Sequence, residues 1–221
     1  MSVTTRPEGL VPHDSIWWDE FWSDRDKHFG PPRESLVQLI LAHALSTSRK
    51  PTDMRLVDIG SGNGRYAIPF AGLGFQTTAI ERSDAGCSLI KSRAAEKNVE
   101  GNLTIVQGDI LAVADSAVKS SSFDVVFSSG LLEEIDKADQ ETALRNITRA
   151  AKPGGLLVLK HCLEIDGRGI TVEEGSVPDF FSKNDDWQIR TLDTDPDMRA
   201  SIATISFESS IRTETIIASR L

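Results

Sequence analysis

Three glycines fall within five residues directly after an apolar run, at Gly60, Gly62 and Gly64 of "VDIGSGNG". Glycine has no Cβ, so a turn built from it can bend sharply and let the backbone approach a ligand closely. Asp58, two residues before the first glycine, adds a fixed carboxylate that would repel a diphosphate and pair well with an ammonium group. We therefore expect the loop to receive a ligand that carries a local positive charge.

Two common nucleotide-binding loops do not fit this spacing. The nicotinamide or flavin fingerprint GxGxxG would place its third glycine or alanine at position 65, where this chain has Arg65. The phosphate-binding pattern GxxxxGK[ST] does not occur in the chain. A nicotinamide-dependent Rossmann oxidoreductase is therefore only the weaker alternative for this loop.

The segments around the loop predict the sheet that positions it. From residue 54 onward, apolar runs of β type alternate with segments of helical period, which is the pattern of parallel strands joined by crossover helices. The predicted strands are residues 55–60, 75–81, 103–109, 123–130 and 156–162. Predicted helices follow three of them, at 63–73, at 83–98 and from Asp139 to a "KPGG" terminator at 152–155. Five such units predict a doubly wound α/β sheet.

The end of the chain departs from this alternation. Residues 186–194 and 212–221 are β-rich, with no clear helix between them. They are expected to pair as an antiparallel edge on the parallel strands. The prediction is a seven-stranded, mostly parallel sheet.

The start of the chain predicts two helices, at residues 13–26 and 33–48. The second is amphipathic, and the apolar residues expected on its buried face are Leu36, Ile40, Leu41 and Leu45. We therefore expect an N-terminal helical cap or lid at 1–50 and one compact ligand-binding domain at 51–221.

Residues 56–163 resemble the class I S-adenosylmethionine-dependent methyltransferases, with the expected elements in order. "VDIGSGNG" is similar to the first motif of that family, in which the glycine turn approaches the methionine portion and the ribose of the cofactor. "KPGG" before the last parallel strand is also usual in the family. The resemblance implies a Rossmann-like methyltransferase fold with S-adenosylmethionine as the cofactor and S-adenosylhomocysteine as its product.

The resemblance also implies roles for residues at the carboxyl ends of the strands. Glu81 matches the acidic residue that binds the ribose hydroxyls, and a carboxylate can accept from both. Asp109 matches the position that accepts from the adenine amino group, with Ile110 alongside the ring. Ser128 and Ser129 match the stretch that lines the methionine end. The expected cofactor-binding residues are Asp58, Gly60, Ser61, Gly62, Gly64, Glu81, Arg82, Asp109, Ile110, Ser128, Ser129, Trp18 and Trp22.

Plainer roles remain open for four of these residues. Glu81 and Asp109 could be solvated carboxylates at strand ends. Asp58 could instead cap the turn. Arg82 fits a position over the adenine face and a position at the protein surface equally well.

Three of the four tryptophans, Trp17, Trp18 and Trp22, lie within six residues, and the last two share one helix face. One interpretation is a helix that packs on the core. The other is a lid whose aromatic rings exclude water and attract a sulfonium by cation–π interaction. "WDEFW" is similar to the start of the thiopurine and tellurite methyltransferase branch, which favours a lid and a small-molecule acceptor.

Methyl transfer from a sulfonium is an in-line displacement, so the protein mainly aligns the nucleophile and excludes water, and a general base is optional. A hydroxyl acceptor could need one, and the candidate catalytic residues are His161, Glu133, Glu134 and His28. His161 could equally be a structural strand residue. The two glutamates could be solvated or could bind a cationic amine. Oxygen, nitrogen and sulfur acceptors all remain open.

The composition argues against several other classes of protein. The chain has 221 residues, a net charge of −9 and no dense basic stripe, so nucleic acid is a poor candidate partner. Its two cysteines, Cys87 and Cys162, lack the spacing of a zinc site, and no metal is expected.

No apolar stretch approaches the roughly 20 residues that cross a bilayer. The chain also starts without a secretory signal pattern, so we expect no membrane partner and a cytoplasmic location. The predicted function is S-adenosylmethionine-dependent methylation of a small molecule, and the main alternative is a non-catalytic protein that keeps the fold and binds the cofactor.

Overall fold

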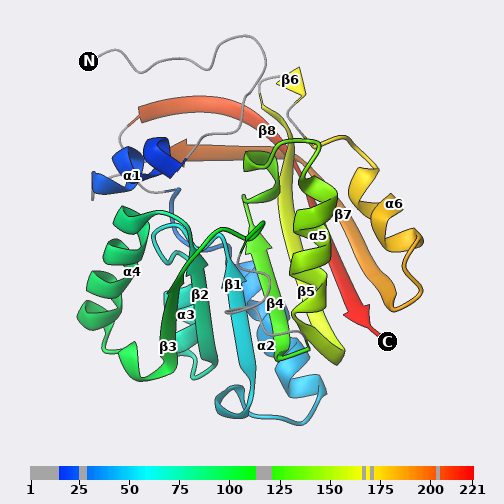
Figure 1. The fold of residues 1–221 in the computed structure, drawn as a ribbon, viewed down its shortest axis with the longest axis horizontal. Helices are drawn as coiled ribbons and strands as arrows, with labels where there is room; N and C mark the ends of the chain where they lie inside the picture. The colour runs from blue at the N-terminus through cyan, green and yellow to red at the C-terminus, as the bar shows by residue number, and fades with distance from the viewer. Residues whose placement is uncertain (1–14, 25–28, 113–120, 166–167, 170–171, 203–204) are drawn as a thin grey trace.

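One open sheet, with helices on both faces, forms the centre of the molecule (Figure 1). The computed structural model describes residues 15–24, 29–112, 121–165, 168–169, 172–202 and 205–221. The strands of the sheet are β1 (Arg55–Ile59), β2 (Gln76–Glu81), β3 (Leu103–Gln107), β4 (Phe123–Ser129), β5 (Ala151–Ile165), β6 (Arg168–Gly169), β7 (Trp187–Ile202) and β8 (Ile205–Arg220). The helices are α1 (Ser15–Ser23), α2 (Glu34–Ser46), α3 (Ala67–Gly72), α4 (Asp84–Lys97), α5 (Gln140–Arg149) and α6 (Ser176–Ser182).

The strand order is β3-β2-β1-β4-β5-β8-β7, and the short β6 pairs with β5 outside this path. The first five strands of the order are parallel, whereas β8 is antiparallel to both β5 and β7. This arrangement confirms the predicted doubly wound, mostly parallel sheet with an antiparallel edge at its end. The parallel strands end together at one edge of the sheet, where ligands bind in open α/β folds.

Side chains of successive strand residues point to opposite faces of the sheet, which gives the molecule two cores. On one face, Leu56, Val125 and Phe127 pack in a cluster with residues of α2 and α3. On the other face, Val57 and Val126 pack in a cluster with residues of α5 and α6. Nearly continuous apolar runs in β1 and β4 follow from this burial on both sides.

The helix after the glycine loop is shorter than predicted. It begins at Ala67 and not at residue 63. Gly64 has a left-handed backbone, with φ of +79°, and a right-handed helix cannot run through that conformation. The extra residues form turns that bring the chain from the loop into α3.

Helix α2 buries the predicted face except at its last turn. Leu36 and Ile40 are buried as expected, but Leu45 is 76% exposed and Ala44 is buried in its place. Ala44 continues the row of residues spaced four apart, so it faces the sheet, and Leu45 points away from it. The amphipathic helix is therefore correct in kind and shifted by one position at its end.

Strand β5 is longer than predicted and begins at Ala151, within the sequence expected to end a helix. Phe123 pairs with Ala151, and Val125 pairs with Leu156, so the register shifts there and β5 takes up the extra residues. Gly154 lies in this irregular stretch with φ of +76°. The "KPGG" sequence at residues 152–155 is therefore part of strand β5, and it begins three residues after α5 ends at Arg149.

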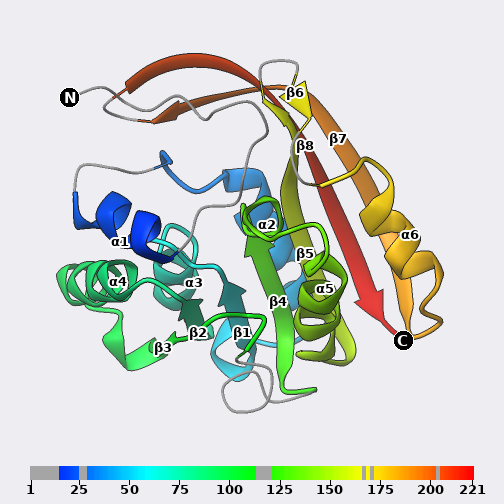
Figure 2. The same ribbon diagram turned by 45° about the horizontal axis from the view of Figure 1, so that its top comes forward.

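The antiparallel edge is also longer than predicted. Strand β5 pairs with β8 from Ile211 to Ser219, and the β7–β8 hairpin continues beyond that to the pair Ile202 and Ile205. Figures 1 and 2 show this outer part curving across the carboxyl-end edge of the sheet. The hairpin therefore reaches over the edge where the glycine loop lies.

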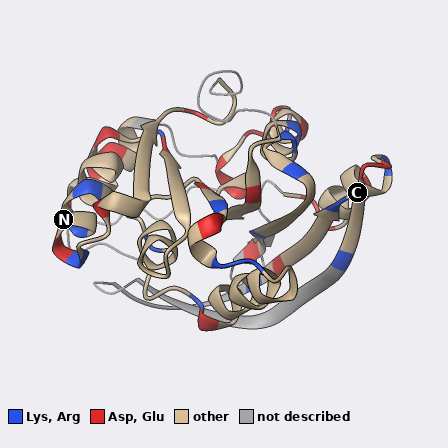
Figure 3. Ribbon diagram, turned by 90° about the horizontal axis from the view of Figure 1, so that it is seen from below, with Lys and Arg blue, Asp and Glu red and all other residues tan. Residues whose placement is uncertain are grey.

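The two N-terminal helices lie in different places. Helix α2 packs into the core of the sheet, whereas α1 lies on α4, where Phe21 and Trp22 contact Leu89. No helix among the described residues is long and apolar enough to cross a membrane. Acidic and basic residues are interspersed along the elements seen in Figure 3.

Candidate functional site

The glycine loop is tied to the end of the neighbouring strand. The backbone N–H groups of Gly60 and Ser61 both donate to the Ile80 carbonyl of β2, at 2.9 and 3.0 Å. Gly60, Gly62 and Gly64 have φ of +76°, +56° and +79°, the region that favours glycine. The predicted turn is therefore present and is held at the carboxyl ends of β1 and β2.

A side chain at any of the three loop glycines would crowd a neighbouring side chain. A Cβ on Gly62 would lie 2.8 Å from the Trp22 ring of α1. On Gly60 it would lie 3.0 Å from Leu131, and on Gly64 it would lie 2.7 Å from Ile68. Neighbouring elements thus approach the loop backbone directly.

Glu81, the last residue of β2, joins the loop to the start of α4. Its Oε2 accepts from the Gly62 N–H at 2.7 Å, and its Oε1 accepts from the Ser83 N–H at 2.9 Å. The residue is buried, and burial raises the pKa of its carboxyl, although both N–H donors act to lower it. Glu81 is therefore a fixed, buried carboxylate and not a solvated strand end.

Asp58 of β1 is buried beneath the same loop. Burial raises the pKa of its carboxyl to about 7, the Ala67 N–H opposes the shift, and the nearby charge of Glu81 adds to it. Its Oδ2 is buried and has no hydrogen-bond partner among the described residues. A buried carboxylate oxygen without a donor costs free energy, which a cationic ligand group could recover.

The residues expected around the adenine lie at the edge of the site. Asp109 follows β3, its Oδ1 accepts from the Leu111 N–H at 2.8 Å, and its side chain is 42% exposed. Arg82 approaches it, with Nη1 4.0 Å from Oδ2. Ile110 is buried, and its carbonyl accepts from Asn146 of α5. The structure therefore brings Arg82 and Asp109 together. Arg82 directly follows β2, which ends at Glu81, and Asp109 follows the neighbouring strand β3.

The two serines at the end of β4 differ in their surroundings. Ser128 is fully buried, and its hydroxyl donates to the Ile59 carbonyl of β1 at 3.0 Å, so that proton is used within the sheet. Ser129 is partly exposed and pairs with Lys160 of β5. Only Ser129 therefore presents a side chain outward at this position.

Helix α1 brings its aromatic face onto the loop. Trp18 and Trp22 are stacked, with ring centroids 5.6 Å apart, and Phe21 and Phe29 stack beside them at 5.4 Å. Trp22 is buried, whereas Trp18 is partly exposed. The structure thus places Trp22 against Gly62 and leaves Trp18 one ring further out.

A cluster of titratable side chains lies near the carboxyl ends of β4 and β5. His161 of β5 is buried, and its Nε2 lies 3.2 Å from Oε2 of Glu214, its register partner on β8. Glu133, in the short helix η4 (Leu132–Glu134), accepts from the Cys162 N–H at 3.3 Å. Burial raises the pKa of Glu133 to about 7, and the nearby His161 opposes the shift.

Glu133 lies just after the carboxyl end of β4, close to the contact between Leu131 and the glycine loop. A Cβ on Gly130 would lie 3.8 Å from Glu133 Oε1, and Leu131, the next residue, packs against Gly60. Glu134 is partly exposed beside it. His28 lies outside the described residues. The structure therefore groups His161, Glu133 and Glu214, and Leu131, two residues before Glu133, contacts the glycine loop.

Two residues of the candidate site, Glu214 and Asp19, were not identified from the sequence. Glu214 could have been found, because alternation in the last strand places it on the same buried face as Ile216. Asp19 of α1 accepts from the Ser83 hydroxyl at 2.6 Å and from the Ala85 N–H at 3.1 Å. No spacing signal marks Asp19, since its partners are more than sixty residues away.

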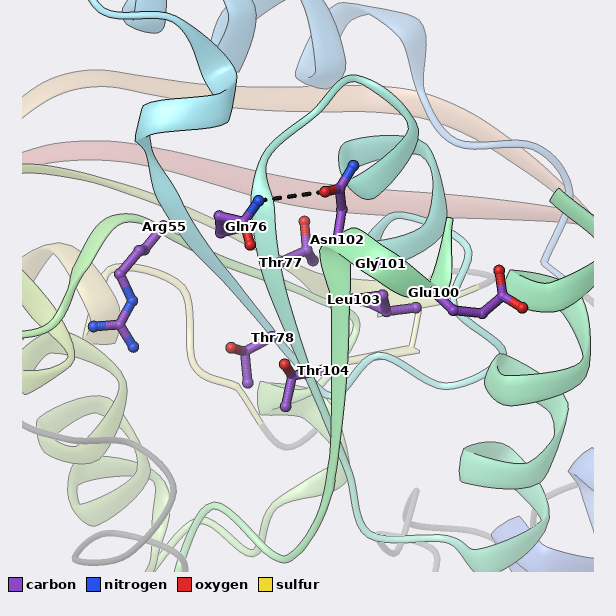
Figure 4. Close-up of a pocket in the computed structure, with 9 residues that line it drawn as sticks. All are labelled: Arg55, Gln76, Thr77, Thr78, Glu100, Gly101, Asn102, Leu103 and Thr104. Carbon is purple, nitrogen blue, oxygen red and sulfur yellow. Dashed lines mark hydrogen bonds between the residues drawn. The ribbon is translucent and has the colours of Figure 1, made fainter. Parts of the chain in front are cut away.

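A polar recess of about 220 Å³ lies at the other end of the strands (Figure 4). Arg55, Gln76 and Leu103, the first residues of three strands, line it, and Gln76 donates to Asn102 at 3.3 Å. It opens at the amino ends of the strands, away from the glycine loop, and is not part of the site. Among the described residues, no group of three or more His, Cys, Asp or Glu side chains could hold a metal ion.

The sequence model of a family described as "Methyltransferase domain" matches residues 57–159. The ubiquinone biosynthesis O-methyltransferase of Caulobacter sp. (strain K31) is 31% identical over 148 residues, which are 65% of this chain and 56% of that protein. The chain thus spans little more than half the length of this relative. The enzyme of the same name from Sinorhizobium medicae (strain WSM419) is 28% identical over 146 residues and is also covered to 56%.

Solved structures show the same fold at low sequence identity. The magnesium protoporphyrin IX methyltransferase of Synechocystis PCC 6803, solved with bound SAM, superposes with a TM-score of 0.67 at 15% identity. The match covers 97% of this chain and all of that one. A structure described as "Conversion of a Disulfide Bond into a Thioacetal Group during Echinomycin Biosynthesis" superposes with a TM-score of 0.69 at 20% identity. The match covers 94% of this chain and 89% of that one. These likenesses concern the fold.

Proposed function

We propose that this chain is a class I S-adenosylmethionine-dependent methyltransferase, which transfers a methyl group from that cofactor to a small-molecule acceptor; the match of residues 57–159 to a methyltransferase domain supports this. When bound, S-adenosylmethionine supplies a methyl group activated by a sulfonium. The chain's own residues would bind and orient the two reactants and exclude water from them.

The observation that carries the proposal is the carboxyl of Asp58. It is buried under the glycine loop, and its Oδ2 has no hydrogen-bond partner among the described residues. An ammonium group, such as that of the cofactor's methionine portion, would supply both the missing donors and the compensating charge. A diphosphate would add repulsion to an already buried carboxylate, which disfavours the nicotinamide alternative.

Other residues of the loop region fit the rest of the cofactor. Each Glu81 oxygen accepts one backbone N–H and keeps further lone-pair capacity, so the carboxylate can also accept from a ribose diol. Asp109 is exposed enough to accept from the adenine amino group, with Arg82 and Ile110 beside it. Ser61 and Ser129 would complete the methionine end, and Ser128 would support it from within the sheet.

For the acceptor we propose a hydroxyl group. The named relatives are O-methyltransferases, and Glu133 provides a carboxyl able to take up the hydroxyl proton near the carboxyl end of β4. His161, paired with Glu214, would stabilise the charge on Glu133. We also propose that α1 is the lid over the cofactor, whereas α2 belongs with the domain that begins at about residue 51, since it packs into the sheet.

Calorimetric titration with S-adenosylhomocysteine tests the proposal. We expect a dissociation constant in the micromolar range, about −8 kcal/mol, for the wild type. Glu81→Ala should weaken binding by roughly ten- to hundredfold, because it removes a charged hydrogen-bond acceptor. Glu100→Ala, in the short helix Glu100–Asn102 at the other end of the strands, is the matched control and should bind like the wild type.

Three outcomes would redirect the proposal. Undiminished affinity in Glu81→Ala would contradict the site assignment. Fluorescence changes on titration with a reduced nicotinamide cofactor would favour the oxidoreductase. Cofactor binding without transfer to any phenol, amine or thiol in an acceptor screen would favour the non-catalytic alternative.

A further inference from the structure

An unbroken chain of hydrogen bonds connects helix α1 to the glycine loop. Asp19 Oδ1 accepts from the Ser83 hydroxyl at 2.6 Å and from the Ala85 N–H at 3.1 Å. The Ser83 N–H donates to Glu81 Oε1 at 2.9 Å, and Glu81 Oε2 accepts from the Gly62 N–H at 2.7 Å. A side chain of α1 is thus linked through two residues to the backbone of the cofactor loop.

Ser83 is the central member of this chain. It is fully buried and caps α4, because its hydroxyl oxygen accepts from the Gly86 N–H at 3.0 Å while the hydroxyl proton goes to Asp19. The hydrogen bond from Ser83 lowers the pKa of Asp19, and that from Ala85 lowers it further, so the carboxylate form is favoured. A negative charge at the amino end of α4 is also favoured by the helix dipole.

Apolar contacts hold α1 in the same position. Phe21 and Trp22 are buried against Leu89 and Ala85 of α4. The Trp22 ring lies so close to Gly62 that a Cβ there would meet it at 2.8 Å. Docking of α1 therefore brings the Asp19 carboxylate to the first turn of α4 and the Trp22 ring to the loop at the same time.

We propose that Asp19 is a positioning residue that couples the docking of α1 to cofactor binding by fixing Ser83 and, through it, the Glu81 carboxylate. The inference rests on the function proposed above and adds a residue that does not itself touch the cofactor. Without Asp19, the Ser83 hydroxyl loses its acceptor, the first N–H groups of α4 lose a partner, and that turn frays. Glu81 then loses one of the two donors that orient it before the ribose arrives, and preorganisation is lost.

Coupling of this kind acts in both directions. Cofactor binding should favour the docked helix, and weakening of the docked helix should weaken cofactor binding. We expect Asp19→Ala to reduce the affinity for S-adenosylhomocysteine by roughly tenfold, within the usual range of coupling between sites. Dissociation should become faster in proportion, because the aromatic face of α1 no longer stays on the loop.

The test uses the full chain with Asp19→Ala and Asp19→Asn, and with Glu20→Ala as the matched control. Glu20 is the next residue of the same helix, carries the same charge and is exposed. Three of the four tryptophans are on α1, and the fourth, Trp187, is buried in the sheet core. Acrylamide quenching of tryptophan fluorescence without ligand therefore reports the docking of α1, and calorimetry with S-adenosylhomocysteine reports affinity.

The proposal predicts raised quenching and weakened binding in Asp19→Ala, smaller changes of both in Asp19→Asn, and neither in Glu20→Ala. In a double-mutant cycle, the effects of Asp19→Ala and Ser83→Ala on affinity should be less than additive, which a residue that only stabilises the fold would not produce. Unchanged or tighter binding in a folded Asp19→Ala variant would overturn the proposal.

A wild type that binds no S-adenosylhomocysteine would overturn both the proposed function and the coupling. Quenching would then still separate the causes. A rise in Asp19→Ala alone would show that α1 is held as described and that the cofactor assignment failed. No rise would show that Asp19 does not hold the helix.

Discussion

At the scale of single residues, the site is built from carboxyl groups that the fold has removed from water. Asp58 and Glu133 both have a pKa raised to about 7 by burial. Asp58 lies two residues before Gly60 and Glu133 two residues after Leu131, and Gly60 and Leu131 are in contact. Raised pKa values of this size are typical of binding and catalytic groups. Each is costly to the free protein when ionised, and each becomes useful when a cation or a proton donor arrives.

Glu133 should lower the stability of the folded protein at neutral and alkaline pH. Its pKa is raised from 4.5 to about 7, so the unfolded chain releases this proton first as the pH rises. The free energy of unfolding therefore falls between about pH 4.5 and 7 and stays level above that. Glu133→Gln should remove the penalty and raise stability at pH 8 by at most about 3 kcal/mol, with little change at pH 4.

Urea denaturation of the wild type, Glu133→Gln and Glu134→Gln at pH 4, 6 and 8 checks this expectation. Glu134 is the adjacent, partly exposed glutamate and serves as the control. A Glu133→Gln variant whose stability relative to the wild type does not change with pH would show that the carboxyl is not buried as described.

At the scale of elements, one aspartate joins three segments at the amino ends of the strands. Asp124 of β4 accepts from Arg49 after α2, from the Arg55 N–H of β1 at 2.8 Å and from Lys152 of β5 at 3.0 Å. Burial alone would raise the pKa of Asp124, but these three donors together lower it. The interaction lies at the end of the sheet opposite to the glycine loop, so it supports the fold without entering the site.

Asp124→Ala should destabilise the protein by about 1–3 kcal/mol. Removing one partner leaves the other charges unpaired, but Arg49 and Lys152 are partly exposed and can be rehydrated, so the loss stays below that of a fully buried pair. Because the folded pKa is lowered, the stabilisation is present above the ordinary aspartate pKa and is lost as the pH falls through the folded value. Thermal unfolding should show a smaller difference from the wild type at pH 3 than at pH 7. Equal differences at both pH values would contradict the role given to this carboxylate.

At the scale of the whole molecule, the sheet brings distant parts of the chain to one edge. Asp58, Glu81 and Ser129 lie at or next to the last residues of three different parallel strands, and α1 and the β7–β8 hairpin approach the same edge from outside. Parallel strands joined by right-handed crossovers place all their carboxyl ends together, which is why one loop sequence can specify a site made from the entire fold.

The same geometry decides what could be predicted from the sequence. The glycine loop, the helix predicted at 83–98 and the alternation of strands and helices are local signals, and the structure confirms each of them. The predicted start of α3 was wrong because the true start depends on the sign of φ at Gly64. Asp19 was missed because its contacts to Ser83 and Ala85 exist only once α1 lies on α4.

The central claim is that a buried carboxyl under a glycine loop receives a cationic group of the cofactor, and titration calorimetry of S-adenosylhomocysteine from pH 5 to 8 tests it most directly. Below about pH 7 the Asp58 carboxyl of the free protein is protonated, so binding of an ammonium group should release a proton. Affinity should therefore fall as the pH drops below 7, by up to about tenfold per pH unit. Asp58→Asn should bind more weakly at pH 8 and lose this pH dependence. Wild-type affinity that is level from pH 5 to 8, with no proton released and no loss in Asp58→Asn, would contradict the account.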